Sequence, residues 1–197
     1  MPDLGTIARV RSPSRLRAVG FDDAPFERRP GGRVFVVGAV CSGTRFEGML
    51  LGRVRQDGWN ATDALLRMLA GSKFLPQLHW ILLDGIAFGG LNVVDLRRLA
   101  TEAGVPAVAV MRRKPDLEAL RRVVMRLPRP AARLAAISRA GPIHVAGKFV
   151  FQVQGAEPER AAEALAHFTD TGHVPEPLRL AHLLGAAIVT GQSGRRA

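Results

Sequence analysis

Short apolar segments separated by turn residues open the chain. We expect strands over residues 17–22, 34–41 and 45–55, because each of these segments is rich in apolar side chains. The connections between them contain Gly31-Gly32 and Ser42-Gly43-Thr44, which are turn sequences. Short turns join antiparallel neighbours, so the pattern predicts a three-stranded antiparallel meander.

The spacing of apolar residues then becomes helical. Asn60 is suited to cap a helix that begins at Ala61, which places Asp63 in the first helical turn. The next apolar run, Trp80 to Leu83, has no polar interruption and ends at Asp84. Such a run predicts a strand that is buried on both faces.

The second half of the chain alternates between helical and extended patterns. We expect a second helix from Asn92 to Gly104, a buried strand over 105–111 and a third helix that begins at Pro115. The third helix is predicted to turn Leu117, Leu120, Val123, Val124 and Leu127 inward. A shorter helix over 131–140, a strand over 148–154 and helices over 157–168 and 177–189 complete the order.

This order, an antiparallel meander followed by strands that alternate with helices, predicts an α/β fold with a ribonuclease H-like mixed sheet flanked by helices. A dinucleotide-binding fold is the competing hypothesis, but the chain contains neither G-x-G-x-x-G nor G-x-x-x-x-G-K-[ST]. We expect a basic flexible arm over residues 1–16, a single domain over 17–190 and a frayed tail over 191–197.

Composition narrows the class of protein. The 197 residues are 47% hydrophobic, which suits a globular domain, and no apolar run approaches the ~18 residues of a membrane span. The basic N-terminus lacks the apolar region of a secretory signal. Cys41 is the one cysteine, so an internal disulfide and a multi-cysteine zinc site are excluded. We therefore expect a cytoplasmic protein that does not enter a membrane.

The net charge of +11 points to a polyanionic partner, with nucleic acid first and an acidic membrane surface second. Between residues 97 and 139 there are eleven Arg or Lys and three acids, so the charge is concentrated in one region. The alternative is a general preference for arginine, since the chain has three lysines among 28 basic residues. The local excess favours nucleic-acid binding.

Three aspartates are candidates for a metal site. In the predicted sheet the first and fourth strands are neighbours, so Asp22 and Asp84 are expected at adjacent strand ends, and Asp63 could complete the cluster. Mg²⁺, or Mn²⁺, binds a few carboxylates together with water and phosphate oxygens and can activate water for phosphodiester hydrolysis. Taken singly, each aspartate also suits a structural role as a turn former or a first-turn helix residue.

Other chemistry has weaker signals. The five histidines are scattered and form no H-E-x-x-H motif, so a zinc site is not favoured. Cys41 lies in an apolar strand and is expected in the core. Gly85, Gly89 and Gly90 could let a phosphate approach the helix that begins near Asn92, although glycine turns after strands usually serve geometry alone.

Several motifs, in order along residues 16–190, resemble an uncharacterised family called domain of unknown function ninety-nine (DUF99, UPF0215-type). They are Gly20-Phe21-Asp22-Asp23-Ala24-Pro25-Phe26, Asp57-Gly58-Trp59-Asn60-Ala61-Thr62-Asp63, Ser72-Lys73-Phe74, Leu83-Asp84-Gly85-Ile86, Phe88-Gly89-Gly90-Leu91-Asn92-Val93-Val94-Asp95, Arg113-Lys114-Pro115-Asp116 and Glu176-Pro177-Leu178-Arg179-Leu180-Ala181-His182-Leu183.

That family is similar to endonuclease V, a magnesium-dependent nuclease with a ribonuclease H-like fold. The resemblance implies that Asp22, Asp63 and Asp84 are catalytic metal ligands and that Lys114 is the catalytic basic residue. The third acid is Asp63 where endonuclease V has Glu, 53–58 replaces the Pro-Tyr-Ile-Pro wedge, and 88–90 replaces a His-Pro-Arg sequence. The resemblance therefore implies that this chain retains the metal ligands of endonuclease V more fully than the segments that recognise inosine.

The residues and the resemblance together predict a magnesium-dependent nuclease that hydrolyses phosphodiester bonds in DNA or RNA. The residues expected to bind nucleic acid are Arg112, Arg113, Lys114, Arg121 and Arg122. A second hypothesis is a nucleic-acid-binding domain of the same fold without turnover. A third is that the basic face docks a protein partner or a ribosomal assembly.

Overall fold

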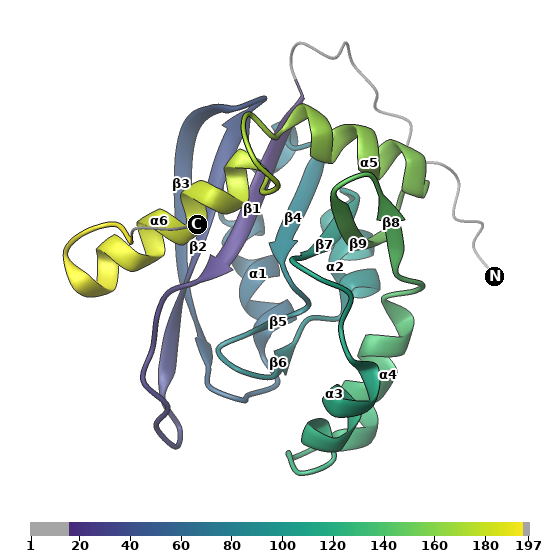
Figure 1. The fold of residues 1–197 in the computed structure, drawn as a ribbon. Helices are drawn as coiled ribbons and strands as arrows, with labels where there is room; N and C mark the ends of the chain where they lie inside the picture. Colours follow the sequence, from purple (N-terminus) through teal and green to yellow (C-terminus); the bar gives the residue numbers. More distant parts are fainter. Residues whose placement is uncertain (1–15, 195–197) are drawn as a thin grey trace.

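The computed structural model describes residues 16–194, and its centre is a seven-stranded sheet (Figure 1). The strand order is β3-β2-β1-β4-β7-β9-β8. The strands are β1 (Arg17–Asp23), β2 (Arg33–Ser42), β3 (Arg45–Arg55), β4 (Trp80–Asp84), β7 (Ala107–Met111), β8 (His144–Ala146) and β9 (Phe149–Gln154). A small separate hairpin joins β5 (Ala87–Phe88) to β6 (Asn92–Val93).

The sheet has an antiparallel half and a parallel centre. Strands β1, β2 and β3 pair antiparallel, which confirms the predicted meander. Strand β1 also pairs parallel with β4, and β4 pairs parallel with β7, whereas β9 and β8 run antiparallel at the far edge. The predicted α/β class and mixed sheet are therefore confirmed, and β1 is central, as the expectation for Asp22 and Asp84 required.

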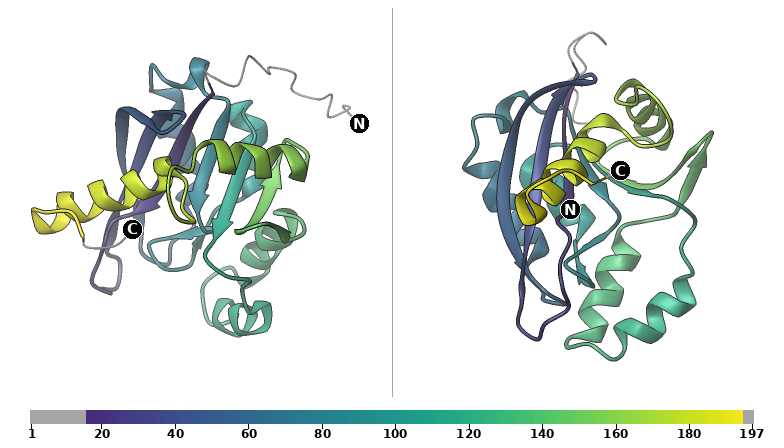
Figure 2. Two further views of the ribbon diagram at one scale, coloured as in Figure 1. Left: turned by 45° about the horizontal axis from the view of Figure 1, so that its top comes forward. Right: turned by 60° about the vertical axis from the view of Figure 1, so that its left-hand side comes forward.

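Helices cover both faces of the sheet (Figure 2). Side chains of α1 (Ala61–Ala70) and α2 (Leu96–Ala103) join one core, while α5 (Pro158–His167) and α6 (Glu176–Thr190) contribute to cores on the other face. A short 3-10 helix, η2 (Leu75–Gln77), precedes β4. The pair α3 (Leu117–Val124) and α4 (Pro130–Arg139) extends from the lower end of the body in Figure 1.

The cap of α1 differs from the prediction. The Asn60 side chain does not cap the helix, because its Oδ1 accepts hydrogen bonds from the backbone N of Arg55 and from Nδ2 of Asn92. The buried Asn92 caps α1 instead, since its Oδ1 accepts from the backbone N of Asn60 (3.0 Å) and of Ala61 (2.9 Å). Asn92 belongs to β6, and α2 begins at Leu96 behind the capping side chain of Asp95.

The predicted inward face of α3 is only partly correct. Val124 is buried, but Leu117 and Val123 are 51% and 48% exposed. The helix packs against α4 at the rim of the domain, so the sheet does not cover its flanks. Helical spacing identified the apolar side of this helix, whereas its burial depends on a neighbour that only partly covers it.

The predicted arm over 1–16 lies outside the described residues except for Leu16, as do residues 195–197 of the predicted tail. Within residues 16–194, no helix combines the length and apolar character needed to cross a membrane.

Candidate active site

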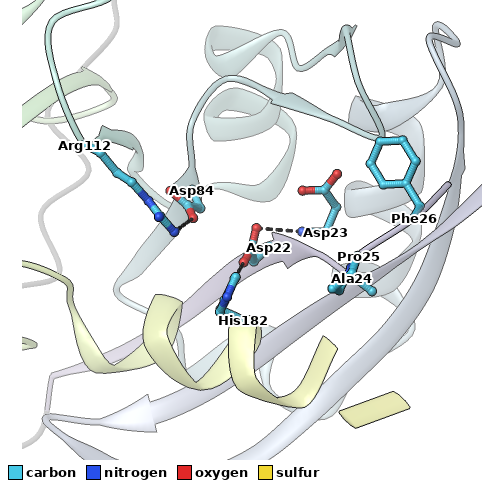
Figure 3. A pocket seen from close by; sticks show the side chains of 8 residues that line it. All are labelled: Asp22, Asp23, Ala24, Pro25, Phe26, Asp84, Arg112 and His182. Atoms are coloured by element: carbon cyan, nitrogen blue, oxygen red, sulfur yellow. Dashed lines mark hydrogen bonds and ion pairs between the residues drawn. The ribbon is translucent and has the colours of Figure 1, made fainter. Parts of the chain in front are cut away.

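Two carboxylates meet where β1 and β4 end. The last paired residues of these parallel strands are Phe21 and Leu83, and both belong to the core that faces α1 and α2. Successive strand residues point to opposite faces, so Asp22 and Asp84 both face the α5 and α6 side. They line a cavity of about 460 Å³ (Figure 3). The cavity is lined by Asp22, Asp23, Ala24, Pro25, Phe26, Asp84, Arg112 and His182.

Asp22 is the more deeply buried of the pair, at 4% exposure. Its Oδ1 accepts a hydrogen bond from the backbone N of Asp23 (2.8 Å), and its Oδ2 lies 2.9 Å from Nδ1 of His182 on α6. Burial, followed by the charge of Asp84, raises the pKa of Asp22 to about 7, although the hydrogen bond from His182 acts in the opposite direction. The surroundings of Asp22 therefore supply too little positive charge to offset its burial and the charge of Asp84.

Asp84 is closer to solvent. Its side chain is 25% exposed, and its Oδ2 lies 3.6 Å from Nη2 of Arg112, whose side chain is 66% exposed. A long ion pair with an exposed partner contributes little in water. Arg112 thus offers only weak compensation to the two carboxylates and remains available to an incoming anion.

Asp23, the last residue of β1, also lines the cavity, as Figure 3 shows. Its Oδ2 accepts a hydrogen bond of 2.7 Å from the backbone N of Gly89, which follows β5. Burial raises the pKa of Asp23, and the hydrogen bond from Gly89 opposes that rise. Asp23 therefore connects the end of β1 to the β5–β6 hairpin.

The donor set of the cavity fits a hydrated divalent cation. Within residues 16–194, no group of three or more His, Cys, Asp or Glu side chains is arranged to hold a metal ion, so a closed protein cage is absent from this part of the chain. Mg²⁺ commonly takes one or two carboxylates and keeps several waters or substrate phosphate oxygens. Asp22 and Asp84 match that requirement, and a cation would balance the charge that raises the pKa of Asp22.

The structure does not bring Asp63 to this pair, which corrects the expected three-carboxylate cluster. Asp63 lies in the first turn of α1, which packs on the opposite face of the sheet from Asp22 and Asp84. Its Oδ1 accepts a hydrogen bond of 2.7 Å from Nη1 of Arg98 on α2. Proximity in sequence to the fourth strand suggested a shared site, but the helix approaches that strand from the other side.

The basic residues predicted to bind nucleic acid divide into two groups. Arg112 follows β7 directly and lines the cavity. Arg113 and Lys114 are exposed in the next turns and do not line it, and Arg121 and Arg122 are exposed on α3. The assignment of Lys114 as a catalytic residue remains a prediction, with the side chain outside the cavity wall.

His182 is the site residue that the sequence-based candidates lacked. It lies 160 positions from Asp22, so no local spacing connects the two residues. The available signal was its place in the C-terminal motif, on a helix whose neighbouring residue Ala181 is buried. That combination puts a histidine on the side of α6 that faces the sheet.

Hydrogen bonds around Asp57 hold the turn before α1 in place. Asp57 donates its backbone N–H to the carbonyl of Gly89 (2.9 Å), and its Oδ1 accepts from the backbone N of Leu91 (2.8 Å). Arg133, 1% exposed, donates to the carbonyls of Asp57 (2.6 Å), Leu91 and Pro128 (2.9 Å). We call Arg133 and these three carbonyls the arginine clamp. It fixes α4 to the turn before α1 and to the β5–β6 hairpin.

Comparison with known proteins gives a consistent result. Residues 14–189 match the family described as Endonuclease dU. A UPF0215 protein of Methanothermobacter thermautotrophicus is 40% identical over 185 residues, which covers 91% of each chain. A UPF0215 protein of Deinococcus radiodurans is 40% identical over 182 residues, which covers 92% of this chain and 93% of the relative. The resemblance to the UPF0215-type family is thereby confirmed.

Solved structures extend the similarity. A protein of unknown function from Archaeoglobus fulgidus has a TM-score of 0.85 at 38% identity and covers 90% of this chain and 100% of its own. Endonuclease V of Bacillus subtilis has a TM-score of 0.62 at 11% identity, with 93% and 85% coverage. Endonuclease V of Ciona intestinalis, solved with DNA that contains inosine, has a TM-score of 0.54 at 14% identity, with 85% and 83% coverage. The endonuclease V-like, ribonuclease H-like fold is confirmed.

Proposed function

The chain belongs to the Endonuclease dU family, and from that premise we propose that it is a divalent-metal-dependent nuclease that hydrolyses phosphodiester bonds in DNA. The observation that carries the proposal is the pair Asp22 and Asp84 on one face of the sheet, at the ends of neighbouring parallel strands. A buried carboxylate beside another is costly in a structure without a compensating cation, so such pairs point to function.

In this mechanism Asp22 and Asp84 would hold Mg²⁺ or Mn²⁺, and His182 fixes the orientation of Asp22 through its Nδ1. The bound metal would supply an activated water and stabilise charge on the phosphate oxygens. Arg112 lines the same cavity and would attract the phosphate. The exposed Arg121 and Arg122 on α3 would attract further phosphates of the strand.

We infer that the substrate is a DNA strand that contains deoxyuridine. Support comes from the description of the family, and from the endonuclease V of Ciona intestinalis, whose structure holds DNA with inosine, another deaminated base. The resemblance to endonuclease V implies that segment 53–58 replaces the wedge of that enzyme. In this chain the arginine clamp holds Asp57 of that segment to the β5–β6 hairpin. We therefore expect little selectivity for inosine, because an extruded base needs a group that takes its place.

The test is cleavage of matched oligonucleotides that contain uracil, inosine or no modification, both single-stranded and double-stranded, with Mg²⁺, with Mn²⁺ and with chelator. We expect metal-dependent nicking of the uracil strand. Strong preference for inosine would contradict the inferred substrate. A crystal soaked in Mn²⁺ should show anomalous density between Asp22 and Asp84, and density elsewhere would contradict the assigned ligands.

The alternative is a nucleic-acid-binding domain without turnover, which the net charge of +11 favours equally. The same assay separates the two functions. Tight, salt-sensitive binding of DNA with no cleavage under any metal would support the binding domain and reject the nuclease.

A further inference from the structure

A second cavity adjoins the carboxylate site. It has a volume of about 670 Å³ and shares the lining residues Pro25 and Phe26 with the first cavity, so the two cavities are neighbours. It extends from the loop between β1 and β2 to the C-terminal part of α6, where Val189 lines it. Cavities of roughly 300–1,000 Å³ hold ligands of nucleotide size.

The second cavity lies on the same face of the sheet as Asp22. On β2, Val37 is the register partner of Asp22, and Phe35 follows two positions away on the same face. Two residues of a strand span roughly 6.8 Å, so Phe35 is within reach of a nucleotide whose phosphate lies at Asp22. A strand bound at the carboxylates therefore reaches this cavity with its neighbouring nucleotide.

An aromatic ring and positive charge characterise the cavity. The guanidinium of Arg53 lies 4.2 Å from the ring centroid of Phe35, its register partner across β2 and β3. Arg29 and Arg33 also line the cavity, and both are exposed. Aromatic rings and arginine planes stack on nucleobases, and guanidinium groups attract the phosphates between them.

The amide that lines the cavity is already engaged. Gln56 accepts a hydrogen bond from the backbone N of Arg29 (2.7 Å) and donates from Nε2 to the carbonyl of Glu27 (2.6 Å). The carboxylate of Glu27 in turn pairs with the Arg29 side chain. These interactions hold the loop and engage both the oxygen and the nitrogen of the Gln56 amide. The cavity is suited to stacking rather than to reading hydrogen-bond patterns.

We propose that this second cavity binds the base of the nucleotide next to the scissile phosphate, and that it does so without regard to which base is present. The inference rests on the proposed function, since it takes the Asp22–Asp84 site as the place of the phosphate. In this proposal the cavity around Phe35 binds the strand, and a different part of the protein recognises the modified base.

The test is an abasic scan. A single-stranded oligonucleotide loses one base at a time, and binding is measured by fluorescence anisotropy in an Asp84→Asn background so that no strand is cut. Removal of one particular base should weaken binding about fivefold or more, the loss expected for one stacked base. In Phe35→Ala the same removal should cost about twofold or less, because the stacking partner is already gone.

Two further variants guard against misfolding of Phe35→Ala. Val189→Asp places a carboxylate in the cavity from an exposed position and should reduce the abasic effect in the same way. Val145→Asp is the matched control, because Val145 is an exposed valine on β8 at the opposite edge of the sheet, and it should behave as the parent. Exchange of the four bases at the sensitive position should change affinity by about threefold or less.

Equal abasic costs in all variants, or strong dependence on base identity, would overturn the proposed cavity function. Cleavage without the coupling to Phe35 would reject this subsite and leave the nuclease intact. If the abasic effect depends on Phe35 but the wild type cleaves no strand with any metal, the proposed nuclease function is rejected and the base-binding cavity is retained.

Discussion

Asp22 and Arg133 are both almost fully buried charged residues, at 4% and 1% exposure, yet their surroundings differ. Arg133 donates to three backbone carbonyls in the arginine clamp and lies 5.6 Å from the ring centroid of Trp59. Asp22 has one backbone donor and His182, but it also faces the charge of Asp84. Arg133 thus has three hydrogen-bond acceptors for its buried charge, whereas Asp22 has two donors and a like charge beside it.

This contrast distinguishes structural from functional buried charge. A buried ion that has enough partners stabilises the arrangement around it, as the arginine clamp does for three segments of chain. A buried ion beside a like charge raises the free energy of the folded protein unless a ligand arrives. Neutralisation of Arg133 is therefore expected to lower the free energy of unfolding, and neutralisation of Asp22 is expected to raise it.

The largest expected effect is on catalysis. Asp84→Asn should reduce metal-dependent cleavage on the order of a thousandfold, because the substitution removes a charge used in the transition state while retaining side-chain size. Binding of the uncut strand should remain equal or become tighter, since one negative charge beside the phosphate is removed. The matched control is Asp63→Asn, which alters a carboxylate on the opposite face. A comparable loss of cleavage in Asp63→Asn would contradict the site geometry.

Neutralisation of the arginine clamp should act on stability. Arg133→Met keeps most of the side-chain volume but leaves three carbonyls without their donors, so the free energy of unfolding should fall by about 3 kcal/mol. Urea denaturation measures the change. Arg160→Met replaces an exposed arginine on α5 and should alter the free energy by about 0.5 kcal/mol or less. An equally small effect for Arg133→Met would show that the clamp contributes no net stability.

Loss of the Asp22 charge should change the free energy of unfolding in the opposite direction. Because burial raises the pKa of Asp22 to about 7, the folded protein binds this proton more tightly than the unfolded chain does. Its contribution to stability is present at about pH 4 and is lost as the pH rises to about 7, a change on the order of a few kcal/mol. Denaturation in chelator across this range should show the fall in wild type.

Asp22→Asn removes that titration. The variant should have a flatter stability profile and should exceed the wild type in free energy of unfolding above about pH 7. Asp63→Asn should keep the wild-type profile. A destabilised Asp22→Asn at pH 8 would mean that the carboxylate is well compensated in the folded protein, contrary to the comparison with Arg133.

The smallest effect concerns the exposed arginines. Replacement of Arg121 and Arg122 by Ala should lower the slope of log affinity against log salt concentration by roughly 1.4–1.8, at about 0.7–0.9 for each phosphate that is no longer neutralised. The control exchanges Arg67 and Arg160, two exposed arginines on α1 and α5, for Ala. Equal slopes in both double variants would indicate that charge over the whole surface, and not α3, binds the strand.

The local pattern of residues determined much of this protein. Alternation and turn residues specified the β1–β2–β3 meander, and an apolar run that ends in a carboxylate marked Asp84 as a strand-end residue. The order of elements then placed Asp22 beside Asp84. These features were predictable because they depend on backbone periodicity and on the adjacency of strands, both of which are expressed over short stretches of chain.

Tertiary structure alone decided which side chains meet. Asp63 was close to β4 in sequence, but α1 packs on the face opposite Asp22, and Arg98 binds its carboxylate. His182 reaches Asp22 because α6 returns across the sheet after most of the chain has folded. Asn92 caps α1 from another segment, and Arg133 finds its carbonyls in three segments. Such contacts depend on how the helices pack on the sheet, so the local sequence around a residue does not predict its long-range partner.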